Sequence, residues 1–414
     1  MRKKNGREAG VTYKTKRISN IPQLYIIKLS KWLMLTMPIV FLFYKENGLG
    51  TTELFVLKAA YSLAIVVLEI PSGYIGDIWG RKNAMVIGAI LGTLGFGIYS
   101  IASGFYAFLM AEIILGIGQS FISGSDSALL YDSLLDAKKE NHYMKAEGRL
   151  ISVGNYAEAI AAPFGVMLAA ASLRTPYFVQ TLIAFSAIPA ALTLREPVRK
   201  KLSSANAAAN MRRIIDYTCI QNKPLFWNII ASSVIGTATL TMGWLVQPLF
   251  AYFALPLAWY GIFIPALNLT TGTVSMVAHV FERKAGFETT LFVIVIGVPL
   301  LYLAIGWFNA TWALAFLFVF YIIRGVATPV LKNHINHVTP SEIRATVLSL
   351  RSLIIRLAFV VLGPVLGWYA DTSSLSSAML AGGMVFLAAG LLSSFRLIYP
   401  RSDVKSYAAV KPMR

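Results

Sequence analysis

The stretch EIPSGYIGDIWGRK, residues 69–82, lies between two long apolar segments and is the polar interruption from which the rest of the chain can be interpreted. After Glu69 it combines three further charged residues with three glycines, namely Asp77, Arg81, Lys82, Gly73, Gly76 and Gly80. Glycine permits backbone conformations and close approaches that other residues resist. The stretch therefore predicts a tight, charged turn at an aqueous surface that joins two apolar helices.

Composition indicates the environment of these apolar segments. The 414 residues are 57% hydrophobic and only 14% charged, with a mean hydropathy of +0.64, whereas a soluble domain carries about 25% charged residues. Apolar runs of about twenty residues recur, which is the length of a helix that crosses a bilayer. Backbone polar groups in hydrocarbon must be paired within such a helix. The sequence therefore predicts an all-α integral membrane protein embedded in a lipid bilayer.

We predict twelve transmembrane helices in two pseudo-symmetric six-helix bundles. The expected spans are 23–44, 53–75, 83–103, 106–132, 150–171, 176–194, 225–252, 258–280, 289–306, 310–331, 345–369 and 377–399. The predicted domains are a tail (1–22), an N-terminal bundle (23–194), a polar linker (195–224), a C-terminal bundle (225–399) and a second tail (400–414).

The basic residues are divided unevenly between the two sides of the expected spans. Most of the 37 Lys and Arg fall in the tails, the linker and every second loop, whereas the other side has little more than Lys45 and Arg174. Because basic residues accumulate on the cytoplasmic side, we expect both termini in the cytoplasm and the chain in the inner membrane as a multi-pass protein. The same rule explains the net charge of +18 without nucleic acid as a partner.

The pattern Gly73-x-x-x-Asp77-x-x-Gly80-Arg81-Lys82 resembles the signature of the major facilitator superfamily, in the loop between the second and third helices. With twelve expected spans and a basic central linker, the resemblance covers the whole chain. The preceding EIPSG is similar to the bacterial branch that includes drug–proton antiporters. The resemblance implies that Asp77 and Arg81 belong to a charge cluster that latches the two halves in the outward-facing state.

Two acidic residues extend the comparison with this family. Asp132, at the cytoplasmic end of the fourth expected span, stands where the family has the acidic partner of the signature arginine. Glu112, in MAEIILGIGQS, stands where antiporters often carry an arginine. The resemblance thus implies a gating motif formed by Gly73, Asp77, Gly80, Arg81, Lys82 and Asp132.

The two halves are expected to be distant repeats. GDIWGRK after the second span is echoed by VFERKAG after the eighth, which matches Arg81 and Lys82 with Arg283 and Lys284, an offset of 202 residues. In this alignment the second copy has lost the glycines. Internal repeats with a site between the halves are common in secondary transporters.

Acidic residues within the expected spans are the candidates for proton coupling, because a charge at membrane depth is costly and faces a cavity or a partner. A carboxyl group in such a place can gain and lose a proton near neutral pH. The predicted proton-coupling residues are Glu158, Asp126 and Glu112. The alternative for each is a static pairing with a nearby Arg or Lys.

Basic and polar residues within the spans are the candidates for substrate contacts. Arg356 and Arg324 could hold an anionic group, because a guanidinium binds carboxylate or phosphate through two parallel hydrogen bonds; the alternative is pairing with Asp126 or Glu158. Lys31 is a further candidate, although Lys28, Lys31 and Lys58 could instead snorkel to an interface. The other predicted substrate contacts are Tyr61, Asn155, Trp244 and Gln247, for which the alternative is to join helices together.

These features predict a secondary active transporter, proton-coupled, that moves a small organic molecule by alternating access. Efflux of amphiphilic compounds by antiport is favoured. Transport of an organic anion or a metal-chelating acid, and flipping of a lipid-linked molecule, are alternatives within the same fold. A non-transporting membrane scaffold or sensor is the alternative from another class.

Several other classes lack their sequence signals. No G-x-x-x-x-G-K-[S/T] loop for ATP is present, and no nucleophile–base set indicates an enzyme. His334 and His337 have no third ligand nearby for a metal, and no cofactor is expected. The single Cys219 excludes an internal disulfide. Nothing in the sequence requires an oligomer, so a monomer is expected.

Overall fold

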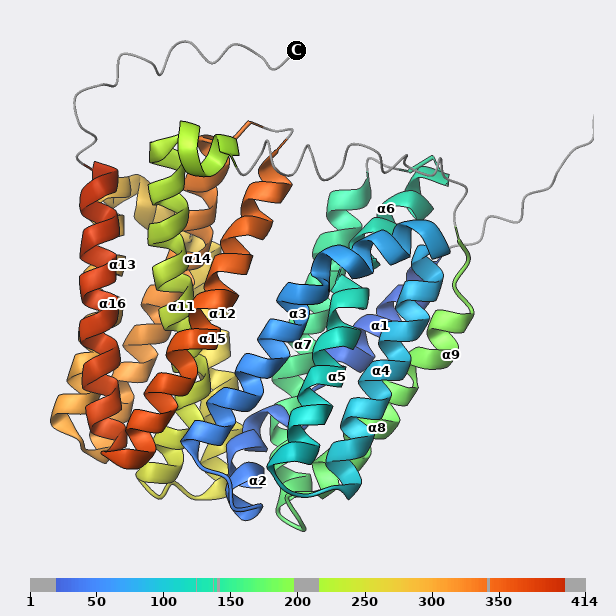
Figure 1. The fold of residues 1–414 in the computed structure, drawn as a ribbon, viewed down its shortest axis with the longest axis horizontal. Coiled ribbons are helices and arrows are strands. Elements are labelled where there is room, and N and C mark those ends of the chain that lie inside the picture. The colour runs from blue at the N-terminus through green and yellow to red at the C-terminus, as the bar shows by residue number, and fades with distance from the viewer. Residues whose placement is uncertain are drawn as a thin grey trace, which may run out of the picture.

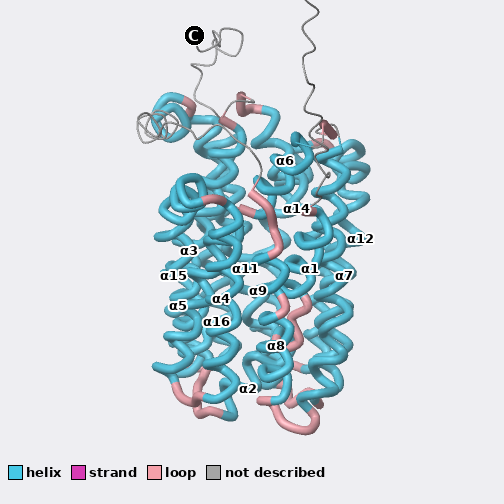
Figure 2. Tube along the Cα trace, turned by 90° about the vertical axis from the view of Figure 1, so that its right-hand side faces the viewer, coloured by secondary structure: helices cyan, strands magenta, loops and turns pink. Residues whose placement is uncertain are grey.

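The computed structural model describes residues 20–123, 125–136, 138–139, 142–196, 216–340 and 343–398. Within these ranges the chain forms helices and no strand, and most helices run roughly parallel to one another (Figure 2). Twelve helical segments are long and apolar enough to cross a membrane. The predicted fold class, an all-α membrane protein with twelve transmembrane helices, is confirmed.

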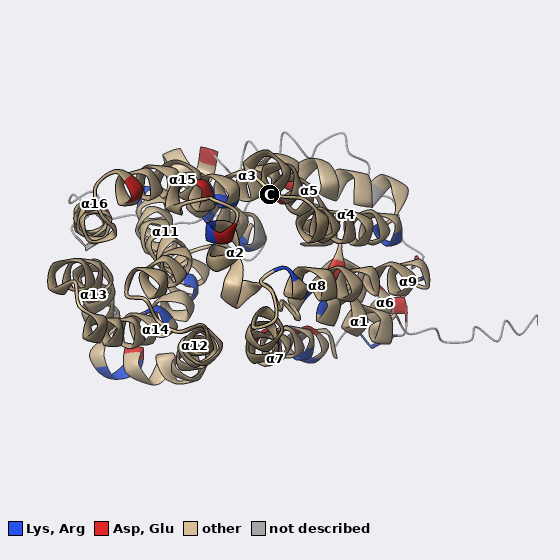
Figure 3. Ribbon diagram, turned by 90° about the horizontal axis from the view of Figure 1, so that it is seen from below, with Lys and Arg blue, Asp and Glu red and all other residues tan. Residues whose placement is uncertain are grey.

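The helices form two bundles that lie side by side (Figures 1 and 3). The N-terminal bundle contains α1 (Ile21–Trp32), η1 (Met37–Ile39), α2 (Val40–Glu46), α3 (Thr51–Trp79), α4 (Arg81–Ile101), α5 (Phe105–Ser123), α6 (Asp126–Asp136), α7 (Tyr143–Ala169), α8 (Thr175–Phe185) and α9 (Ala187–Leu192). The C-terminal bundle contains η4 (Tyr217–Gln221), α11 (Lys223–Tyr252), α12 (Leu257–Ala285), α13 (Phe287–Phe308), η5 (Thr311–Leu314), α14 (Ala315–His337), α15 (Arg344–Thr372) and α16 (Leu375–Ile398).

Two faces of the molecule need names. The terminal face is the end that holds the start of α1 and the end of α16, and the hairpin face is the opposite end, where α3 starts and α15 finishes (Figure 1). Seen from the hairpin face, the helices carry few charged residues (Figure 3). Such sparse charge is expected for surfaces in contact with lipid.

The first span is broken, whereas the sequence predicted one continuous helix over 23–44. It consists of α1, an unwound segment over 33–36, η1 and α2. Pro38 explains the break in part, because proline offers no backbone N–H and disfavours a helical residue before it. The Gln180 side chain accepts a hydrogen bond from the Leu35 N–H at 2.9 Å. Gly165 permits the close approach, since an added Cβ there would collide with the Leu35 carbonyl oxygen.

The tight turn predicted within residues 69–82 is a single residue, Gly80, between α3 and α4. Its φ of +103° lies in the region that favours glycine. Gly286 does the same between α12 and α13 with a φ of +79°, and α3 and α12 both contain 29 residues. The repeat offset is therefore 206 residues, from Gly80 to Gly286. The predicted offset of 202 was wrong, because it matched charged residues rather than the glycine that the turn needs.

The bundles contact each other mainly in the half of the molecule nearer the hairpin face. There α3 packs on α15, and α7 packs on α12. The Phe55 and Phe359 rings lie 5.9 Å apart between centroids, and Gly261 packs against Val166. Toward the terminal face, α3 presents apolar side chains outward, with Ile70 at 70% exposure. The structure therefore has the two halves joined at the hairpin face.

Candidate functional site

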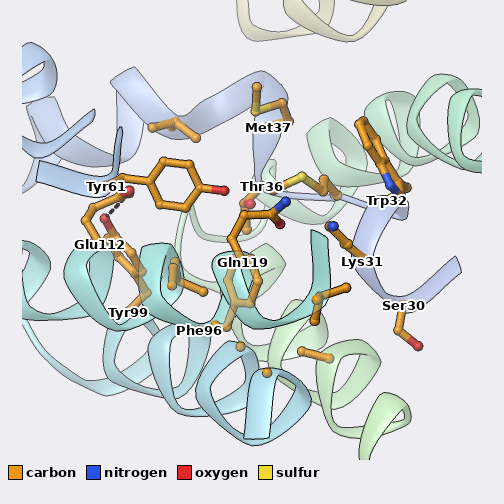
Figure 4. Close-up of a pocket in the computed structure, with 18 of the residues that line it drawn as sticks. Ser30, Lys31, Trp32, Thr36, Met37, Tyr61, Phe96, Tyr99, Glu112 and Gln119 are labelled. Carbon is orange, nitrogen blue, oxygen red and sulfur yellow. Dashed lines mark hydrogen bonds between the residues drawn. The ribbon is translucent and has the colours of Figure 1, made fainter. Parts of the chain in front are cut away.

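A cavity of about 340 Å³ lies where the two bundles meet. Its lining comes almost entirely from the N-terminal bundle, and the C-terminal bundle supplies Trp244 of α11 and Arg356 of α15. Figure 4 shows the side chains of Tyr61, Gln119 and Lys31 pointing into this space from α3, α5 and α1. The cavity is thus a polar-edged pocket within one bundle, covered by two residues of the other.

The broken first span forms one wall of the cavity. Lys31 and Trp32 end α1, Thr36 lies in the unwound segment, and Met37 begins η1 (Figure 4). Non-helical backbone at membrane depth is tolerated where it is buried in protein or lines a cavity. Here one orphaned N–H, that of Leu35, is paired with Gln180. The break therefore brings a cation, an indole ring and a hydroxyl to the same small region.

The remaining wall combines rings with small residues. Gly88 and Gly92 of α4 and Gly118 of α5 line the cavity. The absence of side chains at Gly88 and Gly118 lets α4 and α5 pack closely, since an added Cβ at Gly88 would collide with Ile122 and the Gly118 carbonyl. The aromatic lining consists of Trp32, Tyr44, Tyr61, Phe96, Tyr99, Tyr177 and Trp244. Such a wall suits a flat apolar body.

A buried ion pair stands at one end of the cavity. Glu112 of α5 is only 3% exposed and Lys58 of α3 only 8%, and their charged groups are in direct contact. The same carboxylate accepts hydrogen bonds from the hydroxyls of Tyr99 at 2.7 Å and Tyr44 at 3.1 Å. Lys58 therefore does not reach an interface, so the snorkelling expected of it was wrong. The buried Glu112 carboxylate, rather than water, is the partner of the Lys58 ammonium.

The same lysine also contacts the other bundle. The Lys58 ammonium lies 4.8 Å from the centre of the Trp244 ring, in cation–π geometry. The centre of the Tyr44 ring lies 5.6 Å from the same ammonium. Lys58 therefore connects the Glu112 carboxylate of one bundle with an aromatic face of the other.

Five of the predicted coupling and substrate residues line the cavity: Glu112, Lys31, Tyr61, Trp244 and Arg356. The structure places the other five elsewhere. Glu158 of α7 and Arg324 of α14 are half-buried and within electrostatic range of each other, but do not line the cavity. Asp126 lies 3.5 Å from the Lys28 ammonium. Asn155 is exposed on α7, outside the cavity.

Gln247 also lies outside the cavity, because both ends of its amide bind backbone of the broken span. Its Nε2 donates to the Met37 carbonyl at 2.7 Å, and its Oε1 accepts from the Phe41 N–H at 2.9 Å. These contacts cross between the bundles and leave the side chain 6% exposed. The geometry therefore makes Gln247 a contact between bundles rather than the predicted substrate contact.

The residues of the predicted gating motif lie near the terminal face. Arg81 at the start of α4 forms an ion pair with Asp132 of α6. The Glu196 carboxylate accepts hydrogen bonds from the N–H groups of Arg81 at 2.9 Å and Lys82 at 2.8 Å. Gly73 lies within α3 and Gly80 forms the turn; the Asp77 side chain lies outside the described part. These contacts stay within the N-terminal bundle, and the gating role itself remains a prediction.

Several functional-site residues were missed by the sequence analysis. Trp32, Thr36, Met37, Phe96, Tyr99 and Tyr177 line the cavity and were not among the predicted residues. Pro38 is the signal that could have indicated the first three, because a proline in a predicted span suggests a break. The aromatic residues of α4 and α8 carry no such signal. Among the described residues, no group of three or more His, Cys, Asp or Glu could hold a metal ion.

Comparison with known sequences identifies the family. Residues 29–354 match the Major Facilitator Superfamily. An uncharacterised transporter of this type from Methanocaldococcus jannaschii is 21% identical over 252 residues, which cover 60% of this chain and 62% of that protein. The quinolone resistance protein NorA of Staphylococcus aureus is 20% identical over 209 residues, 50% of this chain and 51% of NorA. The chain thus matches about half to three fifths of these relatives' length.

Solved structures share the fold over nearly the whole chain. The nucleoside transporter NupG has a TM-score of 0.76 at 12% identity, with 92% of this chain and 100% of that chain covered. A D-xylose–proton symporter has a TM-score of 0.71 at 14% identity, covering 91% and 96%. At these identities the likeness shows the fold alone.

Proposed function

Because the chain belongs to the Major Facilitator Superfamily, we propose that it is a proton-coupled secondary transporter that exports small amphiphilic organic molecules by alternating access. The observation that carries this proposal is the central cavity, which lies where two bundles meet whose described contacts are concentrated toward the hairpin face. Similarity to NorA, a quinolone resistance protein, supports export over import. The aromatic wall supports an amphiphilic cargo.

The proposed orientation puts the terminal face in the cytoplasm, within the inner membrane. The support is the excess of Lys and Arg in the tails and in the linker between the bundles. In this orientation the hairpin-face contacts close the outer side, so the described state is open toward the cytoplasm. One chain supplies the whole cavity lining, which supports a monomer as the transporting unit.

We propose Glu112 as the proton-coupling residue, ahead of Glu158 and Asp126. Glu112 alone of the three lines the cavity. When its carboxylate takes up a proton, Lys58 loses its counter-ion while remaining against Trp244 of the other bundle. The charge balance at the contact between bundles then changes with the protonation of Glu112. A ligand or proton can shift a two-state equilibrium only through such a difference between the states.

The test is proton flux in liposomes. Purified protein is reconstituted with a pH-sensitive dye inside, a pH gradient is imposed, and a quinolone is added, since that class gives the staphylococcal relative its name. We expect quinolone-dependent proton movement for the unmodified chain and none for Glu112→Gln. Glu158→Gln and Asp126→Asn are the matched controls, and both keep the flux.

Two results would change the proposal. Loss of flux in Glu158→Gln with retention in Glu112→Gln would move proton coupling to α7. Absence of flux with every compound, in protein that is folded by its thermal transition, would favour the non-transporting scaffold or sensor. The lipid-linked flippase alternative is favoured if a fluorescent lipid, and no soluble compound, changes leaflet.

A further inference from the structure

The charged residues around the cavity do not balance. Three cations line it, namely Lys31, Lys58 and Arg356, against one acid, Glu112. Lys58 and Glu112 neutralise each other in a direct ion pair. Asp126, just outside the cavity, is within electrostatic range of Lys31 but lies 3.5 Å from the Lys28 ammonium. With Lys28 and Asp126 included, the group still holds two positive charges in excess.

The two excess charges are placed on Lys31 and Arg356. Among the described residues, neither side chain forms an ion pair within 4.0 Å, and neither is seen to donate a hydrogen bond to a protein acceptor. Both are only half-exposed. A partly buried cation without a counter-ion has lost part of its hydration and has gained nothing in exchange. An anionic group of a ligand would supply the missing partner.

Polar groups near these cations are suited to orient such a ligand. The Tyr61 hydroxyl lies within electrostatic range of the Arg356 guanidinium, and it points into the same space as the Gln119 amide (Figure 4). The Lys31 ammonium faces this space from the broken span (Figure 4). A hydroxyl and an amide can each donate to a carboxylate. One region of the cavity is therefore cationic and rich in donors.

The rest of the cavity is lined by apolar and aromatic residues and is suited to the apolar part of a ligand. Phe96, Tyr177 and Trp32 line it together with the small residues of α4 and α5. A volume of about 340 Å³ lies at the lower end of the range for drug-sized ligand sites, which is roughly 300–1,000 Å³. The ligand is therefore small, with one or two fused rings rather than an extended chain.

We infer that the cavity binds a small aromatic anion, a ring system that carries a carboxylate, with Arg356 and Lys31 holding the carboxylate and the aromatic wall holding the ring. This inference rests on the proposed function and narrows its substrate class. A permanently cationic amphiphile is disfavoured, because its charge would meet two unpaired cations and no free acid. Arg356 belongs to the bundle opposite Lys31, so the anion also bridges the two halves.

The test is binding to the purified chain in detergent, measured by isothermal titration calorimetry with three matched probes. Naphthoate, naphthalenemethanol and protonated naphthylmethylamine share one ring system and differ in charge. We expect naphthoate to bind about tenfold more tightly than the alcohol and more tightly still than the amine, since one charge-assisted contact contributes about 1.4 kcal/mol or more. Acetate, an anion without a ring, binds at least about tenfold more weakly than naphthoate.

Variants assign the effect to residues. Arg356→Gln and Lys31→Gln each weaken naphthoate binding by about tenfold and leave the affinity for naphthalenemethanol within about twofold. Arg356→Lys restores part of the loss, because it keeps the charge but not the planar fork. Arg324→Gln is the matched control: it removes a membrane-embedded guanidinium outside the cavity and leaves naphthoate affinity unchanged. If Arg356→Gln does not fold, Lys31→Gln and Arg356→Lys decide.

Equal or tighter binding of the amine overturns the inference, as does an equal loss in Arg324→Gln and Arg356→Gln. The proposed function fails separately. Naphthoate binding without any liposome flux would keep the anion site and remove the transporter, whereas flux with the amine alone would keep the transporter and remove the anion site.

Discussion

Asp371 and Glu196 each bind the N-terminus of a helix that is distant in the sequence, and they differ in whether that helix belongs to the other bundle. Asp371 at the end of α15 binds the start of α3 in the other bundle, whereas Glu196 after α9 binds the start of α4 in its own. The first N–H groups of a helix lack partners within the helix and carry the positive end of its dipole. Both carboxylates therefore bind a helix N-terminus in the same way, but Asp371 connects the two bundles whereas Glu196 binds a helix of its own half.

The Asp371 contact is made at the hairpin face. Its two oxygens accept hydrogen bonds from the N–H groups of Thr51 at 3.1 Å and Thr52 at 2.6 Å, and from the Thr52 hydroxyl at 2.6 Å. A single side chain thus joins the halves where they meet. Glu196, at the terminal face, binds the start of α4 within the N-terminal half.

The largest expected effect comes from breaking the contact at the hairpin face. In a Cys219→Ser, Met37→Cys background, Asp371→Ala should raise labelling by a membrane-impermeant maleimide from outside intact cells by about tenfold, since charge-assisted hydrogen bonds hold that side closed. Labelling is followed by a gel-shift assay over time. Glu46→Ala, an exposed acid at the same face, is the control. An unchanged rate for Asp371→Ala would show that the contact does not hold the closed side.

A smaller effect is expected from crowding the same contact. A Cβ added at Gly50 would lie 2.8 Å from Asp371 Oδ2, so Gly50→Ala pushes the carboxylate away without removing it. We expect labelling from outside to rise by about threefold. Gly272→Ala, where an added Cβ meets nothing within 4 Å, should leave the rate unchanged. Equal effects of both substitutions would contradict the role of the contact.

The ion pair of Arg81 and Asp132 should act in the opposite direction. If the gating motif favours the outward-facing state, Asp132→Asn lowers labelling from outside by about twofold, within the range of a partly exposed ion pair. Arg81→Gln should do the same, and the double variant should add little more. A rise in labelling would show that the motif supports the state described above.

The smallest effect is expected for Glu196→Gln. Labelling from outside should not change, because this contact stays within one bundle. The weakened interaction with the α4 dipole should lower the stability of the protein by about 0.3–1 kcal/mol, seen as a slightly lower melting temperature. A change in labelling as large as that of Asp371→Ala would show that both carboxylates influence the closed side equally, which contradicts the proposed difference between them.

The fold could be predicted from the sequence because the hydrocarbon of a bilayer restricts which backbone structures can span it. Apolar length, charge asymmetry and one glycine-rich turn predicted twelve spans and two bundles. The break in the first span was harder, because Pro38 is local but the groups that stabilise the break are not. Gln180 and Gly165 lie far along the chain from Leu35, and no periodicity in one sequence connects them.

The site was predictable only in part, for a related reason. Acids and bases in the spans were visible, but which of them meet was not. Lys58 and Glu112 are separated by 54 residues. Because they pair, Lys58 does not extend to an interface and Glu112 is buried. The repeat offset failed similarly, since charge matched Arg81 with Arg283 whereas backbone geometry matches Gly80 with Gly286.

The uneven lining of the cavity determines what a release step would have to break. Because the C-terminal bundle contributes only Trp244 and Arg356, a cargo seated there travels with the N-terminal bundle and is held from the other side by one ring and one guanidinium. Separating the bundles would cost the cargo a single ionic contact. The residence time of a bound molecule should therefore depend more steeply on residue 356 than on the depth of the pocket.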